Sequence, residues 1–328
     1  MSEWGKRWLL ATCTVCLGSS GMALAQPHQE MPRLGIFWMT DPASAAPYLA
    51  PFKQGLRELG WIEGKNIEII SSYDNGDPAQ RAALAAELVA SKINVFYATA
   101  ALVPAARNAS KSIPIVCPDF YDPVAEGFTT SMARPDGNIT GISWQSVESA
   151  TKRVQLIKEL LPRARRIGMM YDANDPGAAM ELRGVLTAAS GAGIAVEEFG
   201  LLTPNDLKPA LARLKSARLD ALMVSASTLT WLSIGRITRV ATANRIPVIS
   251  EPEDFAKAGA LIAYGADIFP LYRRSAWFVD KVLKGAEPKD LPIEQPTQFQ
   301  LVLNLRTAKA LKLPIPQLIT DRATKIIR

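Results

Sequence analysis

The sequence predicts an α/β protein of two lobes, each a doubly wound parallel sheet, joined by a hinge. Three observations lead to this prediction. Short apolar runs typical of buried strands alternate with longer segments of helical periodicity along most of the 328 residues. The alternation pauses near residue 140 and then restarts. The second half then repeats the first: residues 33–39 correspond to 166–171, and residues 113–117 to 246–250.

The first half contains five expected strands and three expected helices. A short apolar run, RLGIFWM, follows Pro32 and is typical of a buried strand. Gly60 is a C-cap that ends the first helix, and Asp77 with Pro78 begins the second. The strands are expected at residues 33–39, 66–73, 94–98, 113–117 and 139–143, and the helices at residues 47–59, 78–90 and 103–110. A loop is expected at residues 118–123, at the carboxyl end of the fourth strand.

The second half shows the same alternation. Pro162 stops its first helix, and Thr203 is a candidate cap for its third. The helices are expected at residues 150–161, 178–189, 204–216 and 232–243, and the strands at residues 166–171, 195–199, 221–225 and 246–250.

The C-terminal stretch, residues 260–311, predicts that the chain crosses back to the first lobe and then returns to the second. It contains expected strands at residues 260–264 and 299–303, expected helices at 270–283 and 305–311, and a proline-rich loop at 285–296. A segment of this kind can cross to the first lobe and back, which creates several hinge strands and allows closure around a ligand. The expected N-terminal lobe comprises residues 32–142 and 268–296, and the expected C-terminal lobe comprises residues 143–267 and 297–328.

The composition is that of a globular protein. Hydrophobic residues make up 48% and charged residues 21%, and the mean hydropathy of +0.06 argues against a polytopic membrane protein. The net charge of +6 includes no block of five like charges, so we expect no nucleic-acid partner. His28 is the single histidine, which leaves no residue for a catalytic triad or a histidine metal cluster.

The N-terminus has the pattern of an export signal. Lys6 and Arg7 precede a mostly apolar run at residues 8–17, which is too short to span a bilayer. Small residues follow and end in Ala23-Leu24-Ala25, a signal-peptidase pattern. We expect residues 1–25 to be a signal peptide, cleaved after Ala25, that directs the chain to the periplasm. A buried helix or an uncleaved anchor is the alternative, which the following small residues and proline disfavour.

Sequence motifs for chemistry are mostly absent. The chain has no P-loop and no G-x-S-x-G elbow. Gly191-Ala192-Gly193 follows an expected helix rather than a strand, so it indicates a turn and not a dinucleotide site. Cys117 is the only cysteine beyond the expected signal peptide and cannot form an internal disulfide. We therefore expect no enzyme activity, no metal and no cofactor.

Polar residues after the strand ends are the candidate ligand contacts, because ligands of open parallel sheets bind beyond the carboxyl ends of the strands. In the N-terminal lobe this rule selects Thr40, Asp41, Thr99, Ala100, Tyr121 and Asp122. In the C-terminal lobe it selects Asp172, Asn174, Ser227, Thr228 and Glu251. The aromatic candidates are Trp38 and Trp144. Each residue also has a structural interpretation as a cap, a turn residue or a core side chain, so neither interpretation is preferred here.

Several longer motifs resemble a known family. They are residues 122–124 (DPV), 134–141 (RPDGNITG), 264–265 (YG), 271–274 (LYRR), 279–285 (VDKVLKG), 291–297 (LPIEQPT) and 304–311 (NLRTAKAL). These motifs resemble those of ABC transporter substrate-binding proteins, over almost the whole chain from about residue 33. The resemblance implies a type I periplasmic-binding fold without chemistry, similar to tryptophan- and phenylalanine-binding members.

The leading hypothesis is therefore an exported solute-binding protein of an ABC importer. It would bind a small molecule, an amino acid or a related small carboxylate, in the cleft between the lobes and hand it to a membrane permease. The alternative is a ligand-sensing module that feeds a signalling receptor, which neighbouring permease or sensor-kinase genes would distinguish. A third hypothesis, an exported enzyme, is disfavoured by the missing histidines and nucleophile motifs.

Overall fold

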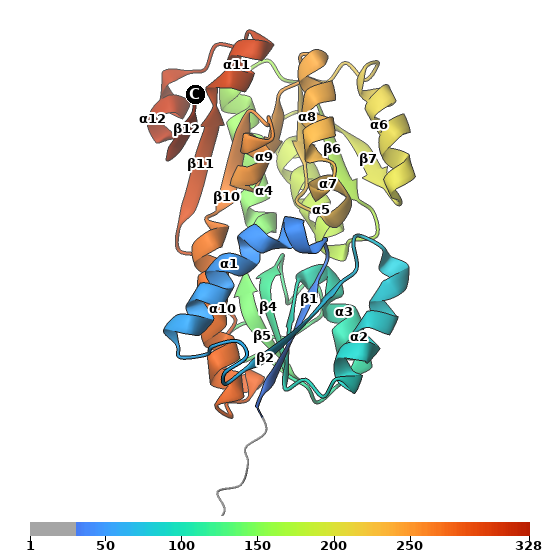
Figure 1. Cartoon of the computed structure of the whole chain (residues 1–328). Helices are drawn as coiled ribbons and strands as arrows, with labels where there is room; N and C mark the ends of the chain where they lie inside the picture. Colours follow the sequence, from blue (N-terminus) through green and yellow to red (C-terminus); the bar gives the residue numbers. More distant parts are fainter. Residues whose placement is uncertain (1–30) are drawn as a thin grey trace, which may run out of the picture. The chain divides into compact units, whose positions relative to one another are not determined.

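The computed structural model describes residues 31–328, in which two sheets are stacked end to end (Figure 1). The expected signal peptide lies outside the described residues. Within residues 31–328, no helix has the length and apolar character that crossing a membrane requires.

The N-terminal lobe is built on a five-stranded parallel sheet of order β2-β1-β3-β4-β5. Its strands are β1 (Arg33–Trp38), β2 (Glu68–Tyr73), β3 (Val95–Ala98), β4 (Ile115–Phe120) and β5 (Ile139–Ser143). Its helices are α1 (Pro42–Glu58), η1 (Pro78–Gln80), α2 (Arg81–Ala90), η2 (Ala100–Leu102), α3 (Val103–Ala109), α10 (Ile268–Leu283) and η4 (Pro288–Asp290).

Both faces of this sheet are covered, as a doubly wound fold requires. Leu34 and Ile36 of β1 pack in one apolar cluster with α1 and α10, whereas Phe37 packs in another with α2 and α3. This alternation follows from the two-residue period of a strand. Because both faces are buried, the inner strands β1 and β3 are mostly apolar, which is why they were recognisable in the sequence, whereas the edge strand β2 is half exposed and partly polar.

The C-terminal lobe is built on a seven-stranded sheet of order β12-β11-β10-β9-β8-β6-β7. Its strands are β6 (Arg166–Asp172), β7 (Ala195–Leu201), β8 (Ala221–Val224), β9 (Val248–Ser250), β10 (Ile262–Ala266), β11 (Phe299–Asn304) and β12 (Lys325–Ile327). Its helices are α4 (Ser146–Leu160), α5 (Pro176–Gly191), η3 (Pro204–Asp206), α6 (Leu207–Leu214), α7 (Thr228–Trp231), α8 (Ile234–Ala243), α9 (Glu253–Lys257), α11 (Leu305–Leu311) and α12 (Gln317–Arg322). Only the β10–β11 pair is antiparallel among the strand pairs of the described chain.

The internal repeat is confirmed by the strand order. The order β2-β1-β3-β4-β5 of the first sheet recurs as β7-β6-β8-β9-β10 in the second. The expected correspondences of β1 with β6 and of β4 with β9 are therefore correct. Loops at the carboxyl ends of strands in both sheets meet between the lobes, where residues that follow β1, β3, β4 and β8 line one cavity.

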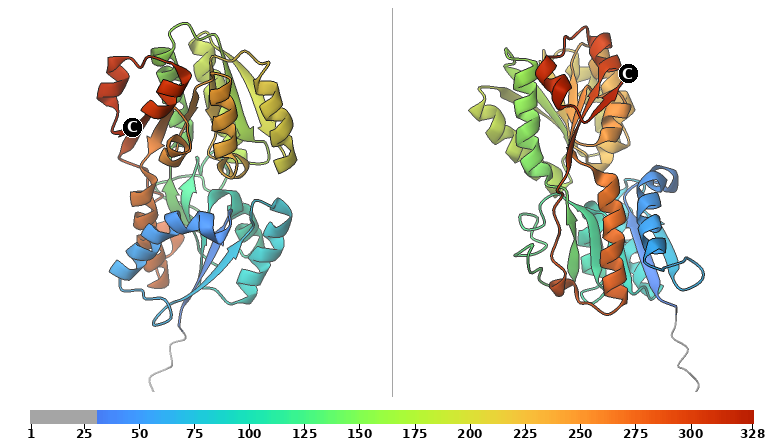
Figure 2. Two further views of the ribbon diagram at one scale, coloured as in Figure 1. Left: turned by 45° about the horizontal axis from the view of Figure 1, so that its top comes forward. Right: turned by 90° about the vertical axis from the view of Figure 1, so that its left-hand side faces the viewer.

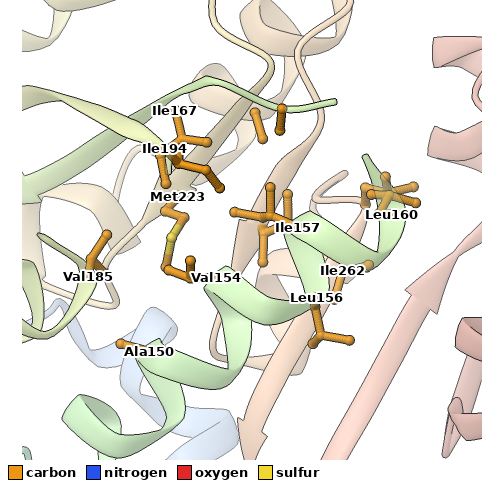
Figure 3. Packing of buried hydrophobic residues seen from close by; sticks show 14 of the residues in the cluster. Ala150, Val154, Leu156, Ile157, Leu160, Ile167, Val185, Ile194, Met223 and Ile262 are labelled. Carbon is orange, nitrogen blue, oxygen red and sulfur yellow. The ribbon is translucent and has the colours of Figure 1, made fainter. Parts of the chain in front are cut away.

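Helix α4 supplies much of the C-terminal core. Its residues Val154 and Ile157 point toward Met223 of β8 and toward Ile167 of β6 (Figure 3). Their spacing of three residues places them on one face of the helix. This packing fixes α4 against β6, the strand that leads into the β6–α5 loop.

The chain passes between the lobes three times. It leaves the first sheet between β5 and α4, returns between β10 and α10, and leaves again before β11. In Figure 2, the orange helix α10 lies beside the first sheet although β10 and β11 belong to the second. We propose that these crossings divide the lobes at the residues expected above, 32–142 with 268–296 and 143–267 with 297–328.

Several expected boundaries were wrong. Helix α1 begins at Pro42 rather than at residue 47, because Asp41 caps it and Pro47 and Pro51 are accommodated inside it. Strand β4 continues through Phe120, so residues 118–120 are not the expected loop. The expected elements also omitted α7, α9, α12 and β12. Each of these has six residues or fewer, which is too short to show a hydrophobic period.

Candidate ligand-binding site

A small enclosed cavity of about 30 Å³ lies between the lobes. Most of its lining comes from the N-terminal lobe and the adjoining crossover, and Asp175, Ala226 and Trp231 come from the C-terminal lobe. The full lining is Trp38, Met39, Thr40, Tyr48, Ala100, Ala101, Asp119, Tyr121, Trp144, Asp175, Ala226, Trp231 and Tyr272. We call this cavity the inner pocket.

Aromatic rings form much of the wall of the inner pocket. Tyr272 of α10 lies at the centre of the group, with its ring centroid 5.6 Å from that of Trp38 and 6.1 Å from that of Trp144. Tyr48 of α1 packs edge-on against Trp231 of the C-terminal lobe at 5.4 Å. These rings give the pocket an apolar surface that suits the apolar body of a small ligand.

Two buried carboxyl groups supply the acidic side of the pocket, one from each lobe. Asp119 accepts hydrogen bonds from the amide of Ala100 at 2.8 Å and from the thiol of Cys117 at 3.3 Å. Asp175 accepts from the amide of Gly177 at 2.9 Å and, across the cleft, from the hydroxyl of Tyr121 at 3.2 Å. Burial raises the pKa of Asp119 to about 7 and that of Asp175 to about 6.

Contacts across the cleft hold the lobes together. The hydroxyl of Tyr48 donates to Asp254 of α9 at 2.5 Å, and the hydroxyl of Thr228 donates to the sulfur of Met39 at 3.1 Å. Gly177 of α5 lies directly against the ring of Tyr121, because a Cβ added to this glycine would be 2.1 Å from the Tyr121 ring. The chain is therefore in a closed arrangement.

A larger chamber of about 670 Å³ adjoins the inner pocket and shares Ala100, Ala101 and Asp175 with it. Its lining includes Arg81, whose guanidinium is paired with Asp74 at 2.7 Å. Glu126 also lines this chamber, and burial raises its pKa to about 8. We call this space the outer chamber.

The structure brings eight of the thirteen candidate residues to these two cavities. Trp38, Thr40, Ala100, Tyr121 and Trp144 line the inner pocket. Asp172, Asn174 and Thr228 line the outer chamber, together with Ala100. Whether any of them contacts a ligand remains a prediction.

The other five candidates lie outside both cavities. Asp41 caps α1 by accepting from the amides of residues 43 and 44, and Asp122 accepts from the amides of residues 124 and 125. Ser227 accepts from the amide of residue 172. Thr99 is buried behind Ala100, and its hydroxyl has no partner within the described part of the chain. Glu251 belongs to a buried charge cluster in the C-terminal lobe.

Strand-end reasoning missed several lining residues. Tyr48, Trp231 and Tyr272 lie on helices, where an aromatic residue at helical spacing is indistinguishable from a core residue. Asp119 lies inside β4 rather than in the expected loop, and Asp175 precedes Pro176 as a helix cap does. The alternation within β4, where Cys117 and Asp119 fall on the same face, was a signal that could have identified Asp119. Residues 31–328 contain no group of three or more His, Cys, Asp or Glu side chains placed to hold a metal ion.

The chain is similar to several known proteins. It is 28% identical over 284 residues to a tyrosine-binding protein of Clostridioides difficile (strain R20291), which covers 86% of this chain and 81% of that protein. A conserved domain protein from Vibrio cholerae is 25% identical with a TM-score of 0.85, over 90% of this chain and 100% of the other. A domain from Streptococcus pneumoniae solved with L-Trp has a TM-score of 0.82 at 22% identity, over 90% of this chain and 100% of the other, and shows the same fold.

One comparison bears on the closed arrangement. A ligand-free, open substrate-binding protein from Clostridium difficile is 26% identical over 90% of this chain and 99% of the other, but the TM-score is only 0.65. This lower score agrees with a chain whose lobes are closed here and apart in the open relative.

The family itself is identified by a match over most of the chain. The family model for ABC transporter substrate binding proteins matches residues 41–327. The family and the tyrosine-binding relative are binding proteins, so the expectation that the chain is not an enzyme is confirmed. The family resemblance and the type I periplasmic-binding fold are confirmed as well. The chain belongs to the ABC transporter substrate binding protein family.

Proposed function

We propose that the chain is an exported solute-binding protein of an ABC importer, which captures an amino acid or a related small carboxylate between its lobes. The inner pocket carries this proposal, because its wall is built from both lobes. A ligand that contacts both lobes stabilises the closed state by its differential affinity for that state. A membrane permease would then receive the solute from the closed form.

The lining supports an amino acid with an apolar side chain. Trp38, Tyr272 and Trp231 offer apolar surface, and Asp119 and Asp175 are suited to an ammonium group. Among the relatives, the protein of Clostridioides difficile binds tyrosine. We propose that the candidates lining the inner pocket, Trp38, Thr40, Ala100, Tyr121 and Trp144, contact the ligand.

Export to the periplasm rests on the sequence of residues 1–25. The basic residues, the short apolar run and Ala23-Leu24-Ala25 support a cleaved signal peptide. Mass spectrometry of the protein recovered from a periplasmic extract should give the mass of a chain that begins at Gln26. A chain that keeps residues 1–25 and remains with the cell membrane would contradict export with cleavage.

A thermal-shift screen against amino acids and aromatic acids tests the proposed ligand class. Binding to the folded state raises Tm as ligand concentration exceeds Kd, so at least one amino acid should raise Tm in a concentration-dependent manner. Native mass spectrometry of the protein purified from cells provides a second test, because a co-purified solute would appear as added mass. If no amino acid or small carboxylate shifts Tm, the proposed ligand class is wrong.

A further inference from the structure

Among residues 31–328, the lining of the inner pocket includes two carboxyl groups and no basic side chain. From this we infer that the ammonium group of the solute is the charged group that the pocket requires, and that apolar primary amines without a carboxylate are also ligands. This inference rests on the proposed function, since it concerns the ligand of the same pocket.

One carboxyl oxygen of Asp119, Oδ2, accepts no hydrogen bond from the described residues. Both hydrogen bonds that the structure gives to this carboxyl, from Ala100 and from Cys117, fall on Oδ1. Oδ2 is therefore left for a donor from outside the protein. Asp119 lines the pocket and is only 8% exposed, so a donor at Oδ2 would be held where water is largely excluded.

The other lobe contributes Asp175, which is 7% exposed and lines the same pocket. Within residues 31–328, its Oδ2 accepts only from Tyr121. Both carboxyls therefore border one cavity, and the charge of Asp175 adds to burial in raising the pKa of Asp119. A single ammonium group between them would relieve this repulsion and link the lobes.

Backbone amides at the end of a parallel sheet are the usual partners of a ligand carboxylate. Here the protein's own carboxylates occupy those at the start of three helices. Asp41 takes the first amides of α1, Asp119 takes the amide of Ala100 that opens η2, and Asp175 takes the first amides of α5.

Nor does a basic side chain replace these amides. No lysine or arginine lines the inner pocket in the part of the chain that the structure describes. Arg81, in the outer chamber, is already paired with Asp74 and also donates to the carbonyl of Ala101. The ligand carboxylate therefore has no dedicated positive partner in the inner pocket.

The apolar body of the ligand would lie among the rings once they move apart, because the cavity of about 30 Å³ in this closed arrangement is smaller than an aromatic side chain. Trp38, Tyr272 and Trp231 line the pocket, and aromatic faces also attract a cation that lies over them. Aromatic monoamines combine the two features that the pocket recognises, a cationic head and a flat apolar body.

Three matched series of ligands test this inference by titration calorimetry on the purified protein. The amino acids are L-phenylalanine, L-tyrosine and L-tryptophan. The amines that lack the carboxylate are 2-phenylethylamine, tyramine and tryptamine. The acids that lack the ammonium group are 3-phenylpropionate, 3-(4-hydroxyphenyl)propionate and indole-3-propionate.

We expect the best amine to bind within about tenfold of its parent amino acid, and the matching acid to bind about 100-fold more weakly or not at all. Amino acids that bind while all three amines fail would overturn the inference and leave the proposed function intact. An acid that binds as tightly as its parent amino acid would also overturn the inference. If members of none of the three series bind, the inference and the proposed ligand class fail together.

Asparagine variants provide a second test. Asp119→Asn and Asp175→Asn keep an oxygen that can accept from the capped amides and remove the charge. Each should weaken binding of the best amine by about 10- to 100-fold. Asp41→Asn is the matched control, since it makes the same change at a cap outside the pocket and should leave the affinity unchanged. Equal affinity in all three variants would contradict the inference, and the wild-type ligand series decides the matter if either pocket variant does not fold.

Discussion

Arg153 is buried in the C-terminal lobe, where the neighbouring carboxylates neutralise its positive charge. It is paired with Glu181, lies 3.7 Å from Glu251, and donates to the hydroxyl of Ser149 at 2.8 Å. Burial raises the pKa of Glu251, whereas the charge of Arg153 opposes that rise. The cluster links α4 and α5 with the residue that follows β9.

Arg153→Met should destabilise the protein strongly. Removing one partner of a buried ion pair leaves uncompensated charge, which costs about 3–5 kcal/mol. Urea unfolding followed by circular dichroism measures this cost. Arg183→Met is the control, because Arg183 is an exposed residue of α5, and its free energy of unfolding should change by less than about 0.5 kcal/mol. An equally small change for Arg153→Met would contradict the role of the cluster.

The affinity for an amine-bearing ligand should fall with decreasing pH. The pKa is about 7 for Asp119 and about 6 for Asp175, so both carboxyls become protonated between pH 8 and pH 5 and lose their attraction for an ammonium group. We expect titration calorimetry with the best ligand to show affinity about 100-fold lower at pH 5 than at pH 8. Asp119→Asn should flatten this dependence.

In the ligand-free protein, the contribution of Asp119 and Asp175 to the free energy of unfolding should increase as the pH decreases. A carboxyl whose pKa is raised by folding favours the folded state at low pH, and that contribution is lost as the pH rises from about 4 through about 7. Asp172 and Glu126 lie near the same carboxyls, and burial raises their pKa values too. The free energy of unfolding is therefore measured at each pH for wild type and for Asp119→Asn, and the two are compared.

For ligand binding, an affinity that does not change between pH 8 and pH 5 would contradict this role of the carboxyls.

Two signals in the sequence predicted lining residues of the pocket. Thr40, Ala100 and Tyr121 were found because the carboxyl ends of parallel strands meet at one edge, and Trp38 and Trp144 were found as aromatic candidates. Tyr48 and Tyr272 were not predicted. Their helices bury a continuous apolar face, and the 3.6-residue period identifies that face but not which of its residues border the cleft.

At the scale of elements, the start of α5 decides how closely the lobes approach. Gly177 follows the cap Asp175 and lies against Tyr121 from the other lobe. A side chain at this position is compatible with the helix and would collide with the ring only when the lobes are closed.

Gly177→Ala should therefore weaken ligand binding without unfolding the protein. Its Cβ would lie 2.1 Å from the ring of Tyr121, and overpacking of this kind costs about 1–3 kcal/mol, which corresponds to an affinity loss of about tenfold or more. Titration calorimetry measures the loss. Gly191→Ala on the same helix is the control, because no atom lies within 4 Å of its added Cβ. Identical affinities for the two variants would show that the contact does not control closure.

The strands were predicted better than the shorter helices. Strands buried on both faces are continuous apolar runs bounded by turn residues, so β1 and β8 were placed within a residue of their true bounds. Helix α1 was expected to start five residues too late, because Pro47 was taken as its beginning although the helix contains it. Short helices such as α7 and α9 depend on tertiary packing, which a local pattern does not contain.

At the scale of the whole molecule, the repeat of the strand order explains why the pocket lies where it does. Both sheets present the carboxyl ends of equivalent strands to the cleft, and the chain joins them by three crossings. The sequence was sufficient to predict the repeat and the cleft from the restart of the alternation. It was not sufficient to predict which side chains meet across the cleft, because those contacts depend on the relative orientation of the two lobes.

The central claim is that a small solute draws the two lobes together, and small-angle X-ray scattering with and without ligand tests it most directly. The purified protein should show a smaller radius of gyration at saturating L-tyrosine or L-tryptophan than in the absence of ligand. Gly177→Ala should change less under the same conditions. Scattering curves that superimpose with and without a ligand that calorimetry shows to be bound would contradict the account.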